Sequence, residues 1–189
     1  MTYWTDLYLI HYGRSKKDGA PGVGTGNWKR TRYLTPENAR PGERTKAAND
    51  ISRSLTKQER IWLMDDDIDY VDDHEYYKGM STNVYSLIKE YGGVPVSAID
   101  VWEDTDNGKR NGVGMVSILV RNDERFRHQG QGQEAVENML KWFGDSKLSE
   151  LEWGVFRDNE RSRRLAERNG FKLKQDDKND NFVVYSRKK

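Results

Sequence analysis

The stretch RFRHQGQGQEAVENMLKWF, residues 125–143, joins a loop with two glycines directly to an amphipathic helix. The apolar residues of the helical part recur at helical spacing and therefore share one face: Ala135, Val136, Met139, Leu140 and Phe143. The first turn of a helix leaves about four backbone N–H groups without intrahelical partners and carries partial positive charge. Because glycines let a ligand approach the backbone closely, the sequence predicts a phosphate-binding loop, to which Arg125, Arg127 and His128 add positive charge.

The glycine pattern of this loop restricts the choice of phosphate ligand. A P-loop of the Walker A type requires Lys and then Ser or Thr after its last glycine, and neither follows Gly132. A dinucleotide-binding loop requires G-x-G-x-x-G, or Ala in place of the last glycine, and Gly130, Gly132 and Ala135 satisfy that spacing. The local pattern alone is therefore compatible with a dinucleotide, although such a site also needs a parallel βαβ unit.

Three strands are predicted before the loop, over residues 83–91, 94–104 and 113–121, because each segment is rich in Val, Ile and Tyr. Gly92 and Gly93 separate the first two segments and are a hairpin turn signal. Sequential strands with short connections usually lie side by side. The three strands are therefore expected to form an antiparallel meander, which argues against the dinucleotide site.

The segments after the helix of the opening stretch alternate between strand and helix. Residues 151–156 are predicted to form a short strand, and residues 160–169 a helix with Asn159 as its N-cap and Gly170 as its end. Residues 171–187 are predicted to form a closing hairpin. From residue 83 onward the order is β-β-β-α-β-α-β-β, which predicts a mixed α/β domain.

The N-terminal third of the chain is predicted to contain helices that cover the sheet. Residues 34–64 are expected to be helical in two pieces. The first piece has Thr35 as N-cap and Pro36 at the first helical position, and the second has the capping box of Thr56 and Glu59. Residues 1–33 contain a glycine-rich segment that opens no helical pattern. We therefore expect a partly extended appendage over residues 1–33 and the domain proper over residues 34–189.

Two motifs in the C-terminal half resemble those of the GCN5-related N-acetyltransferase (GNAT) family. Arg127-x-x-Gly130-x-Gly132 after a strand resembles the R/Q-x-x-G-x-G/A signature of that family. The stretch NERSRRLAERNGF resembles a second segment of the family at these positions: Asn159, Ser162, Leu165, Gly170 and Phe171. The resemblance covers roughly residues 83–186. It implies a GNAT-like fold, in which an antiparallel meander is followed by β-α-β-α-β-β and two parallel strands splay apart.

The resemblance also implies acetyl-coenzyme A (acetyl-CoA) as the cofactor, held between the third strand and the strand at residues 151–155. By analogy, the pantetheine arm pairs with the backbone of Leu119 and Val120, while Asn159 and Ser162 flank it. The pyrophosphate would lie on the amides of one loop, formed by Arg127, His128, Gln129, Gly130, Gln131, Gly132 and Gln133. Read from the sequence alone, Asn159 is also a plain helix N-cap, and the two roles can coexist.

The catalytic residues are less well defined, because the sequence departs from the family pattern. Many family members carry a Tyr general acid where this chain has Ala166, and many carry a Glu on the third strand, where this chain has no carboxylate. Acetyl transfer to an amine needs a deprotonated amine held near the thioester, so positioning alone supplies much of the rate. Glu103 is the first candidate for the base, with Asp104 and Glu124 as further candidates, and Tyr185 is the candidate proton donor. The alternative interpretation is that each of these acids is a solvated surface residue and that Tyr185 is a packing residue.

Composition limits the other classes of function. The net charge is +1, so no global field favours nucleic acid or a membrane surface, and nucleic acid is an unlikely partner. The chain has no Cys, which excludes disulfides and thiolate chemistry. Its three His residues lie far apart in the sequence, so we expect no metal site. Without an apolar run of about 20 residues, we expect no membrane span and a cytoplasmic location.

The appendage gives a further indication of origin. Residues 8–26, YLIHYGRSKKDGAPGVGTG, resemble a short leader of proteins encoded by tailed phages and prophages. That resemblance implies a phage or prophage protein, and virion association is an alternative location. A disordered tail or one additional strand is the other reading of this segment. Residues 1–60 are the predicted contact region for a homodimer partner or for a phage or host protein.

The sequence therefore supports two functional hypotheses. The first is an acetyl-CoA-dependent N-acetyltransferase that modifies a primary amine of a protein or small molecule. The alternative is a non-catalytic GNAT-fold module of a phage that binds coenzyme A or serves an interaction. The acceptor is not identified, although the acids in residues 65–75 and 176–180 would attract a cationic amine.

Overall fold

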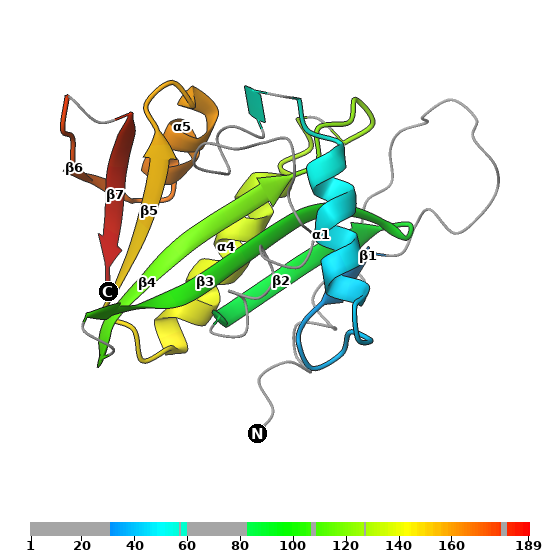
Figure 1. Ribbon diagram of the computed structural model, residues 1–189, viewed down its shortest axis with the longest axis horizontal. Coiled ribbons are helices and arrows are strands. Elements are labelled where there is room, and N and C mark those ends of the chain that lie inside the picture. The colour runs from blue at the N-terminus through cyan, green and yellow to red at the C-terminus, as the bar shows by residue number, and fades with distance from the viewer. Residues whose placement is uncertain (1–30, 57, 60–82, 107–108, 127, 179–180) are drawn as a thin grey trace.

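In the part of the chain that the structure describes, seven strands form one mixed sheet with helices on both of its faces (Figure 1). This computed structural model describes residues 31–56, 58–59, 83–106, 109–126, 128–178 and 181–189 of the chain. The order of strands across the sheet is β1-β2-β3-β4-β5-β7-β6. Along the chain the elements are β1 (Thr31–Leu34), α1 (Glu43–Arg53), β2 (Asn83–Tyr91), β3 (Val94–Asp106), β4 (Lys109–Val120), α4 (Gln131–Asp145), β5 (Glu150–Phe156), α5 (Glu160–Arg168), β6 (Lys172–Gln175) and β7 (Phe182–Lys188).

The predicted antiparallel meander is confirmed in strands β2, β3 and β4. Gly92 and Gly93 form the turn between β2 and β3 with φ angles of 60° and 80°. Positive φ at both central residues matches the right-handed twist of the flanking strands and favours glycine. The pairing of β3 with β4 continues to Ser97↔Val120. The predicted mixed α/β fold is therefore correct.

Strands β4 and β5 run parallel but pair over a short distance only. Their register comprises Val113↔Glu150, Gly114↔Leu151 and Met115↔Glu152. Beyond Met115 and Glu152 no further pair joins them among the described residues, although β4 continues to Val120 and β5 to Phe156. Figure 1 shows the two strands diverging from their common end. We call this divergence, between residues 116–120 of β4 and residues 153–156 of β5, the fork.

The two faces of the sheet carry separate apolar clusters. Helix α1 covers β2, β3 and β4 on one face, where Ile51 packs with Ile88 and Leu119. Helices α4 and α5 lie on the opposite face, where Met139 and Ala166 join a larger cluster with residues from β2 to β7. In Figure 1, α1 passes in front of β2 and β3 while α4 lies behind the sheet. The expected apolar stripe of α4 is confirmed, because its members are buried or partly buried in this larger cluster.

The N-terminal region differs from the prediction. Residues 36–38 form a turn and not a helix, because the Asn38 side chain accepts a bond from the backbone N–H of Thr35 and closes the segment locally. The first helix, α1, begins instead after Gly42, whose φ of 75° is left-handed. The capping box is confirmed, since Thr56 and Glu59 exchange bonds between side chain and backbone.

The predicted boundary of the appendage falls inside strand β1. Residues 31–33, assigned to the appendage from the sequence, pair with β2 in the register Thr31↔Tyr91 to Leu34↔Ile88. They are therefore part of the sheet. Residues 1–30, which carry the leader-like segment, and the whole acidic segment at residues 65–75 lie outside the described residues.

Candidate functional site

Helix α4 begins beside the open end of the fork with a turn that no side chain caps. Its N-cap, Gly130, has a left-handed φ of 74° and makes no side-chain cap bond. The N–H of Glu134 donates to the Gly130 carbonyl at 2.9 Å, which is the first bond of the helix. The N–H groups of residues 131–133 precede it and have no intrahelical acceptor. These three amides and the dipole of a 15-residue helix present partial positive charge to a ligand.

The loop before this turn is exposed. His128 adopts a left-handed φ of 58°, and the side chains of His128 and Gln129 face solvent. We call residues 128–133 the α4 entry turn. Arg127, the first residue of the predicted phosphate-binding motif, lies outside the described residues. The structure thus brings the predicted residues His128 to Gln133 together as one turn at the end of the fork.

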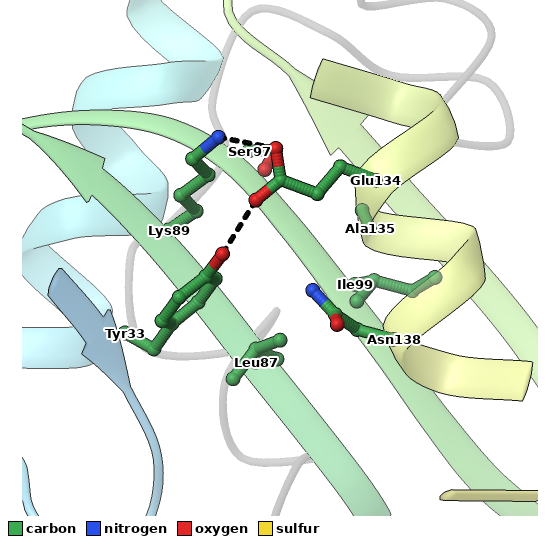
Figure 2. Close-up of a pocket in the computed structure, with 8 residues that line it drawn as sticks. All are labelled: Tyr33, Leu87, Lys89, Ser97, Ile99, Glu134, Ala135 and Asn138. Atoms are coloured by element: carbon green, nitrogen blue, oxygen red, sulfur yellow. Dashed lines mark hydrogen bonds and ion pairs between the residues drawn. The ribbon is translucent and has the colours of Figure 1, made fainter. Parts of the chain in front are cut away.

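The side chain of Gln131 is directed into the protein and away from any ligand. Gln131 is 6% exposed, and Lys89 on β2 donates to its side-chain oxygen at 2.9 Å. The Lys89 ammonium also forms an ion pair with Glu134, to which the Tyr33 hydroxyl donates as well (Figure 2). Burial and the bond to Glu134 raise the pKa of Tyr33, so its hydroxyl stays protonated as a donor. This network ties the first turn of α4 to β1 and β2.

A shallow depression lies beside this network, but it has no room for a ligand. Figure 2 shows the lining, which consists of three residues of the network, Tyr33, Lys89 and Glu134, and of Leu87, Ser97, Ile99, Ala135 and Asn138. The space amounts to about 170 Å³ in all and part of it is open to solvent, yet no water-sized sphere fits between the side chains. We therefore interpret the depression as packing between α4 and the sheet.

The α4 entry turn also contacts both sides of the fork. A β-carbon built at Gly132 would lie 3.2 Å from Leu165 Cδ2 on α5 and 3.4 Å from Val120 Cγ2 at the end of β4. The Gln133 side chain pairs with Asn169, the C-cap of α5. Gly132 is therefore confined between β4 and α5, and only a residue without a side chain fits there unchanged.

The backbone of Val120 faces the fork, whereas that of Leu119 faces β3. The N–H of Arg121 donates to the Val96 carbonyl at 2.9 Å, so this residue pair is hydrogen-bonded in the antiparallel register. Hydrogen-bonded pairs alternate along such a ladder. The backbone groups of Leu119 therefore point to β3 and those of Val120 toward the fork. The Leu119 side chain is buried against α1.

The predicted N-cap at Asn159 is present on the β5 side of the fork. The Asn159 side-chain oxygen accepts a bond from the N–H of Ser162 at 3.1 Å. Ser162 itself is half-buried in the first turn of α5. Asn159 therefore has at least the structural role that the sequence suggested. A role of either residue in cofactor binding stays a prediction.

The two predicted catalytic residues lie apart from each other and away from the open end of the fork. Glu103 on β3 is opposite Gly114, where β4 and β5 are still paired, and accepts a bond from the N–H of Gly112 at 3.3 Å. Tyr185 on β7 is opposite Trp153 and 2% exposed. Ala166, which stands at the family's usual Tyr position, is fully buried in the core.

The Tyr185 hydroxyl is held by α5. It donates to Glu167 at 2.8 Å and accepts from Arg163 at 3.2 Å. Burial is the main cause that raises the pKa of Tyr185. Arg163 and Glu167 share one flank of α5. Leu165 and Asn169 contact α4 and lie two residues further along the chain in each case. Because an offset of two residues is a rotation of about 200° on a helix, they occupy the opposite flank. The hydroxyl thus lies on the flank of α5 remote from α4.

Two groups near the site were missed from the sequence. Asp100 on β3 is 3% exposed, accepts a bond from Ser86 and lies 3.7 Å from an Arg44 nitrogen on α1. An acid inside the apolar run VPVSAIDVW was a visible signal of such a buried pair. The pairing of Gln133 with Asn169 had no such signal, because two amides 36 positions apart show no pattern.

No membrane-spanning helix and no metal cluster occur in the part of the chain that the structure describes. None of the described helices is long and apolar enough to cross a membrane. The His, Asp and Glu side chains of the described residues form no group of three that would hold a metal ion.

Comparisons with known proteins agree with this geometry. No curated protein matches the chain by sequence. Among solved structures, a GNAT-family acetyltransferase from Streptococcus pneumoniae aligns at 15% identity and a TM-score of 0.61, over 84% of this chain and 99% of that one. The GNAT domain of S. lividans PAT aligns at 10% identity and 0.67, over 84% and 89%.

A third similar structure contains a ligand. The yncA protein of Salmonella typhimurium, solved with its cofactor acetyl-CoA, aligns at 14% identity and a TM-score of 0.60, over 84% of this chain and 93% of that one. These likenesses concern the fold. The family itself is shown by the sequence model for the acetyltransferase (GNAT) family, which matches residues 48–171. The chain therefore belongs to the GNAT family of acetyltransferases.

Proposed function

We propose that the protein is an acetyl-CoA-dependent N-acetyltransferase that transfers the acetyl group to a primary amine. The observation that carries the proposal is the fork between β4 and β5, with the uncapped α4 entry turn at its open end. Membership of the GNAT family supports acyl transfer as the class of reaction. When bound, the cofactor would supply the acetyl group as a thioester.

The residues at the fork fit such a cofactor in three respects. The amides of residues 131–133 have no intrahelical acceptor and no side-chain cap, and they would bind the pyrophosphate. The backbone groups of Val120 point into the fork and would bond to the amide groups of a pantetheine arm. Gly132 lets the entry turn lie close to β4 and α5, where a side chain would press on Leu165 and Val120. Leu119 would contribute less than predicted, because its backbone groups face β3.

Catalysis in this proposal rests mainly on positioning. The acceptor amine must lose a proton before attack and the leaving thiolate must gain one. Glu103 and Tyr185 stay candidates for these steps, although neither lies at the open end of the fork. Holding the amine and the thioester in line supplies much of the rate without them. Because a buried Ala166 stands at the family's usual Tyr position, the second candidate function is a module that binds coenzyme A without turnover.

The origin and acceptor remain proposals from the sequence. A phage or prophage origin, and contacts to a phage or host protein or a second copy, rest on residues that lie largely outside the described ones. The acceptor would be an amine of a protein or small molecule, and a location in the host cytoplasm suits a supply of acetyl-CoA. The acids Asp176 and Asp177 are exposed, as attraction of a cationic amine requires.

Calorimetric titration with acetyl-CoA tests the proposal, followed by measurement of thiol release against a panel of amines and peptides. Gly132→Glu should abolish binding, because a carboxylate side chain would enter the space beside Leu165 and oppose the phosphates. Gly144→Ala is the matched control, since a β-carbon there meets no atom within 4 Å. Absence of binding by the wild type would overturn the proposal, and binding without thiol release would favour the non-catalytic module.

A further inference from the structure

We propose that Gln133 and Asn169 are positioning residues that hold the α4 entry turn at a fixed place relative to α5, across the fork. The inference rests on the proposed function, because the turn matters only if it binds the cofactor's pyrophosphate. It adds a device that the family motif does not specify. The motif defines the glycines, whereas this pair fixes the spacing between the two sides of the site.

The two amide side chains bond to each other in both directions. Gln133 Nε2 donates to Asn169 Oδ1 at 2.9 Å, and Asn169 Nδ2 donates to Gln133 Oε1 at 3.0 Å. The second proton of Asn169 Nδ2 goes to the Leu165 carbonyl at 2.8 Å, and that of Gln133 Nε2 to Glu137 at 3.0 Å. All amide protons of the pair are therefore used, which fixes the orientation of both groups.

The Asn169 side of the pair is buried, whereas the Gln133 side chain is half-buried. Asn169 is 7% exposed and ends α5 as its C-cap. Arg187 on β7 donates to the Asn169 carbonyl and ties this residue to the sheet as well. A buried amide that loses its partner leaves unsatisfied groups, so the pair opposes separation of the two helices. Breaking either half should loosen the other.

The position of the pair gives it a function. Helix α4 follows β4 and helix α5 follows β5. Among the described residues, three residue pairs join these strands, all at the closed end of the fork. At the open end, the Gln133–Asn169 pair and the contact of Gly132 with Leu165 connect the two sides. Because the Gln133 side chain is engaged with Asn169, the entry turn offers the ligand its backbone amides, held in a set direction.

The consequence is specific to the phosphate end of the cofactor. Without the pair, the amides of residues 131–133 would sample several orientations, and ordering them would reduce the affinity. The acetyl group binds at the other end of the cofactor and would be positioned as before. Loss of the pair should therefore raise KM for acetyl-CoA and leave kcat nearly unchanged. An acetyl donor without phosphates, S-acetyl-N-acetylcysteamine, should react equally well with wild type and variants.

The experiment uses Gln133→Ala, Asn169→Ala, the double variant and the exchanged pair Gln133→Asn with Asn169→Gln. Dissociation constants for acetyl-CoA are measured by calorimetry, and kcat and KM with both acetyl donors. Each single variant should weaken acetyl-CoA binding about tenfold, the double variant no further, and the exchanged pair should recover most of the affinity. Lys141→Ala, at an exposed position of α4, serves as the surface control.

Equal affinities of wild type and single variants, additive losses, or an equal loss with the phosphate-free donor would overturn the inference. If Asn169→Ala fails to fold, Gln133→Met decides alone, because this half-buried helical position accepts an unbranched apolar side chain without the bonds. A wild type that binds no acetyl-CoA would overturn the proposed function and this inference together. A wild type that binds, with unaffected variants, would overturn only the inference.

Discussion

At the scale of single residues, Gly114 shows how tightly the closed end of the fork is packed. A β-carbon at this position would lie within 2.9 Å of side-chain atoms of three residues: Leu148, Val101 and Leu151. Such contacts force the neighbours to move, and overpacking of this kind costs about 1–3 kcal/mol. Gly114→Ala should therefore lower the free energy of unfolding by that amount, as measured by urea denaturation.

The control for this prediction is Gly144→Ala near the end of α4. A β-carbon there meets no atom within 4 Å, and its φ is not positive. Replacing glycine by alanine in a helix reduces the conformational entropy of the unfolded chain. This variant should raise the free energy of unfolding by about 0.5–1 kcal/mol. Similar stabilities for the two alanine variants would show that the contacts around Gly114 are looser than described.

Asn159 allows its two suggested roles to be separated. Asn159→Asp keeps a side-chain acceptor for the Ser162 N–H, so the cap should survive, whereas Asn159→Ala should lower the free energy of unfolding by about 1 kcal/mol. If Asn159 also donates to the cofactor, Asn159→Asp should weaken acetyl-CoA binding while the thermal midpoint holds. Calorimetry and thermal unfolding of both variants check this. If both variants bind acetyl-CoA with unchanged affinity, Asn159 serves only as the N-cap of α5.

Residue roles were predictable from the sequence where they depend on local geometry. The cap at Asn159 and the glycine at the start of α4 follow from signals within a few residues. The inward side chains of Gln131 and Gln133 were assigned to the ligand loop, and their partners, Lys89 and Asn169, are distant in the sequence. No local pattern carries such contacts, because they arise only when the elements pack.

At the scale of elements, local sequence patterns predicted the strands of the meander well, whereas they predicted α1 poorly. Alternating Val, Ile and Tyr with a Gly-Gly turn identified β2 and β3, whose geometry is set within the hairpin. Helix α1 buries a small face of Ala47, Ala48 and Ile51, so its apolar periodicity is weak. Its start at a left-handed glycine also lacks the usual capping residues.

Strand β7 and helix α5 are joined by Tyr185, and this contact can be tested. The Tyr185 hydroxyl bonds to Arg163 and Glu167 on the flank of α5 remote from α4. Tyr185→Phe should lower the free energy of unfolding by about 1 kcal/mol, because these bonds are lost, and kcat should stay within about twofold. Kinetics with acetyl-CoA and an accepted amine check the second part. A kcat reduced about tenfold or more at unchanged stability would instead identify Tyr185 as the proton donor.

At the scale of the whole molecule, the topology was only partly accessible from the residues. Alternation and turn signals predicted the number and order of elements from residue 83 onward. They did not show that β5 lies beside β4 or that β7 is inserted between β5 and β6. The parallel pairing was implied by the family resemblance alone. Long-range pairing leaves little trace in local sequence, since each strand forms the same pattern with any neighbour.

Surface ion pairs make the stability of the molecule dependent on pH. Hydrogen bonds from Arg125 hold the pKa of Asp123 at about 2, and bonds from Arg32 and Arg40 lower the pKa of Glu43. A carboxyl group whose pKa is lower in the folded state stabilises the fold above its unfolded pKa, and this contribution disappears as the pH falls through the folded pKa. For Asp123 the window runs from 3.8 to about 2.

The thermal midpoint should therefore decline as the pH falls from about 4 to about 2. In the Arg125→Ala variant the thermal midpoint should change less with pH across this window, because Asp123 loses its main hydrogen-bond donor. Arg125 is exposed and Asp123 is only half-buried, so the difference should be small and should diminish at high salt. Parallel curves for wild type and Arg125→Ala at low salt would contradict the assigned cause of the Asp123 pKa.

The proposed function requires that the fork between β4 and β5 binds acetyl-CoA with its pyrophosphate on the α4 entry turn. A crystal structure of the protein with coenzyme A tests this most directly. We expect pyrophosphate oxygens within hydrogen-bonding distance of the amides of residues 131–133, and the pantetheine arm beside Val120 with the Gln133–Asn169 pair intact. Coenzyme A bound elsewhere on the protein, or a fork without ligand at saturating coenzyme A, would contradict it.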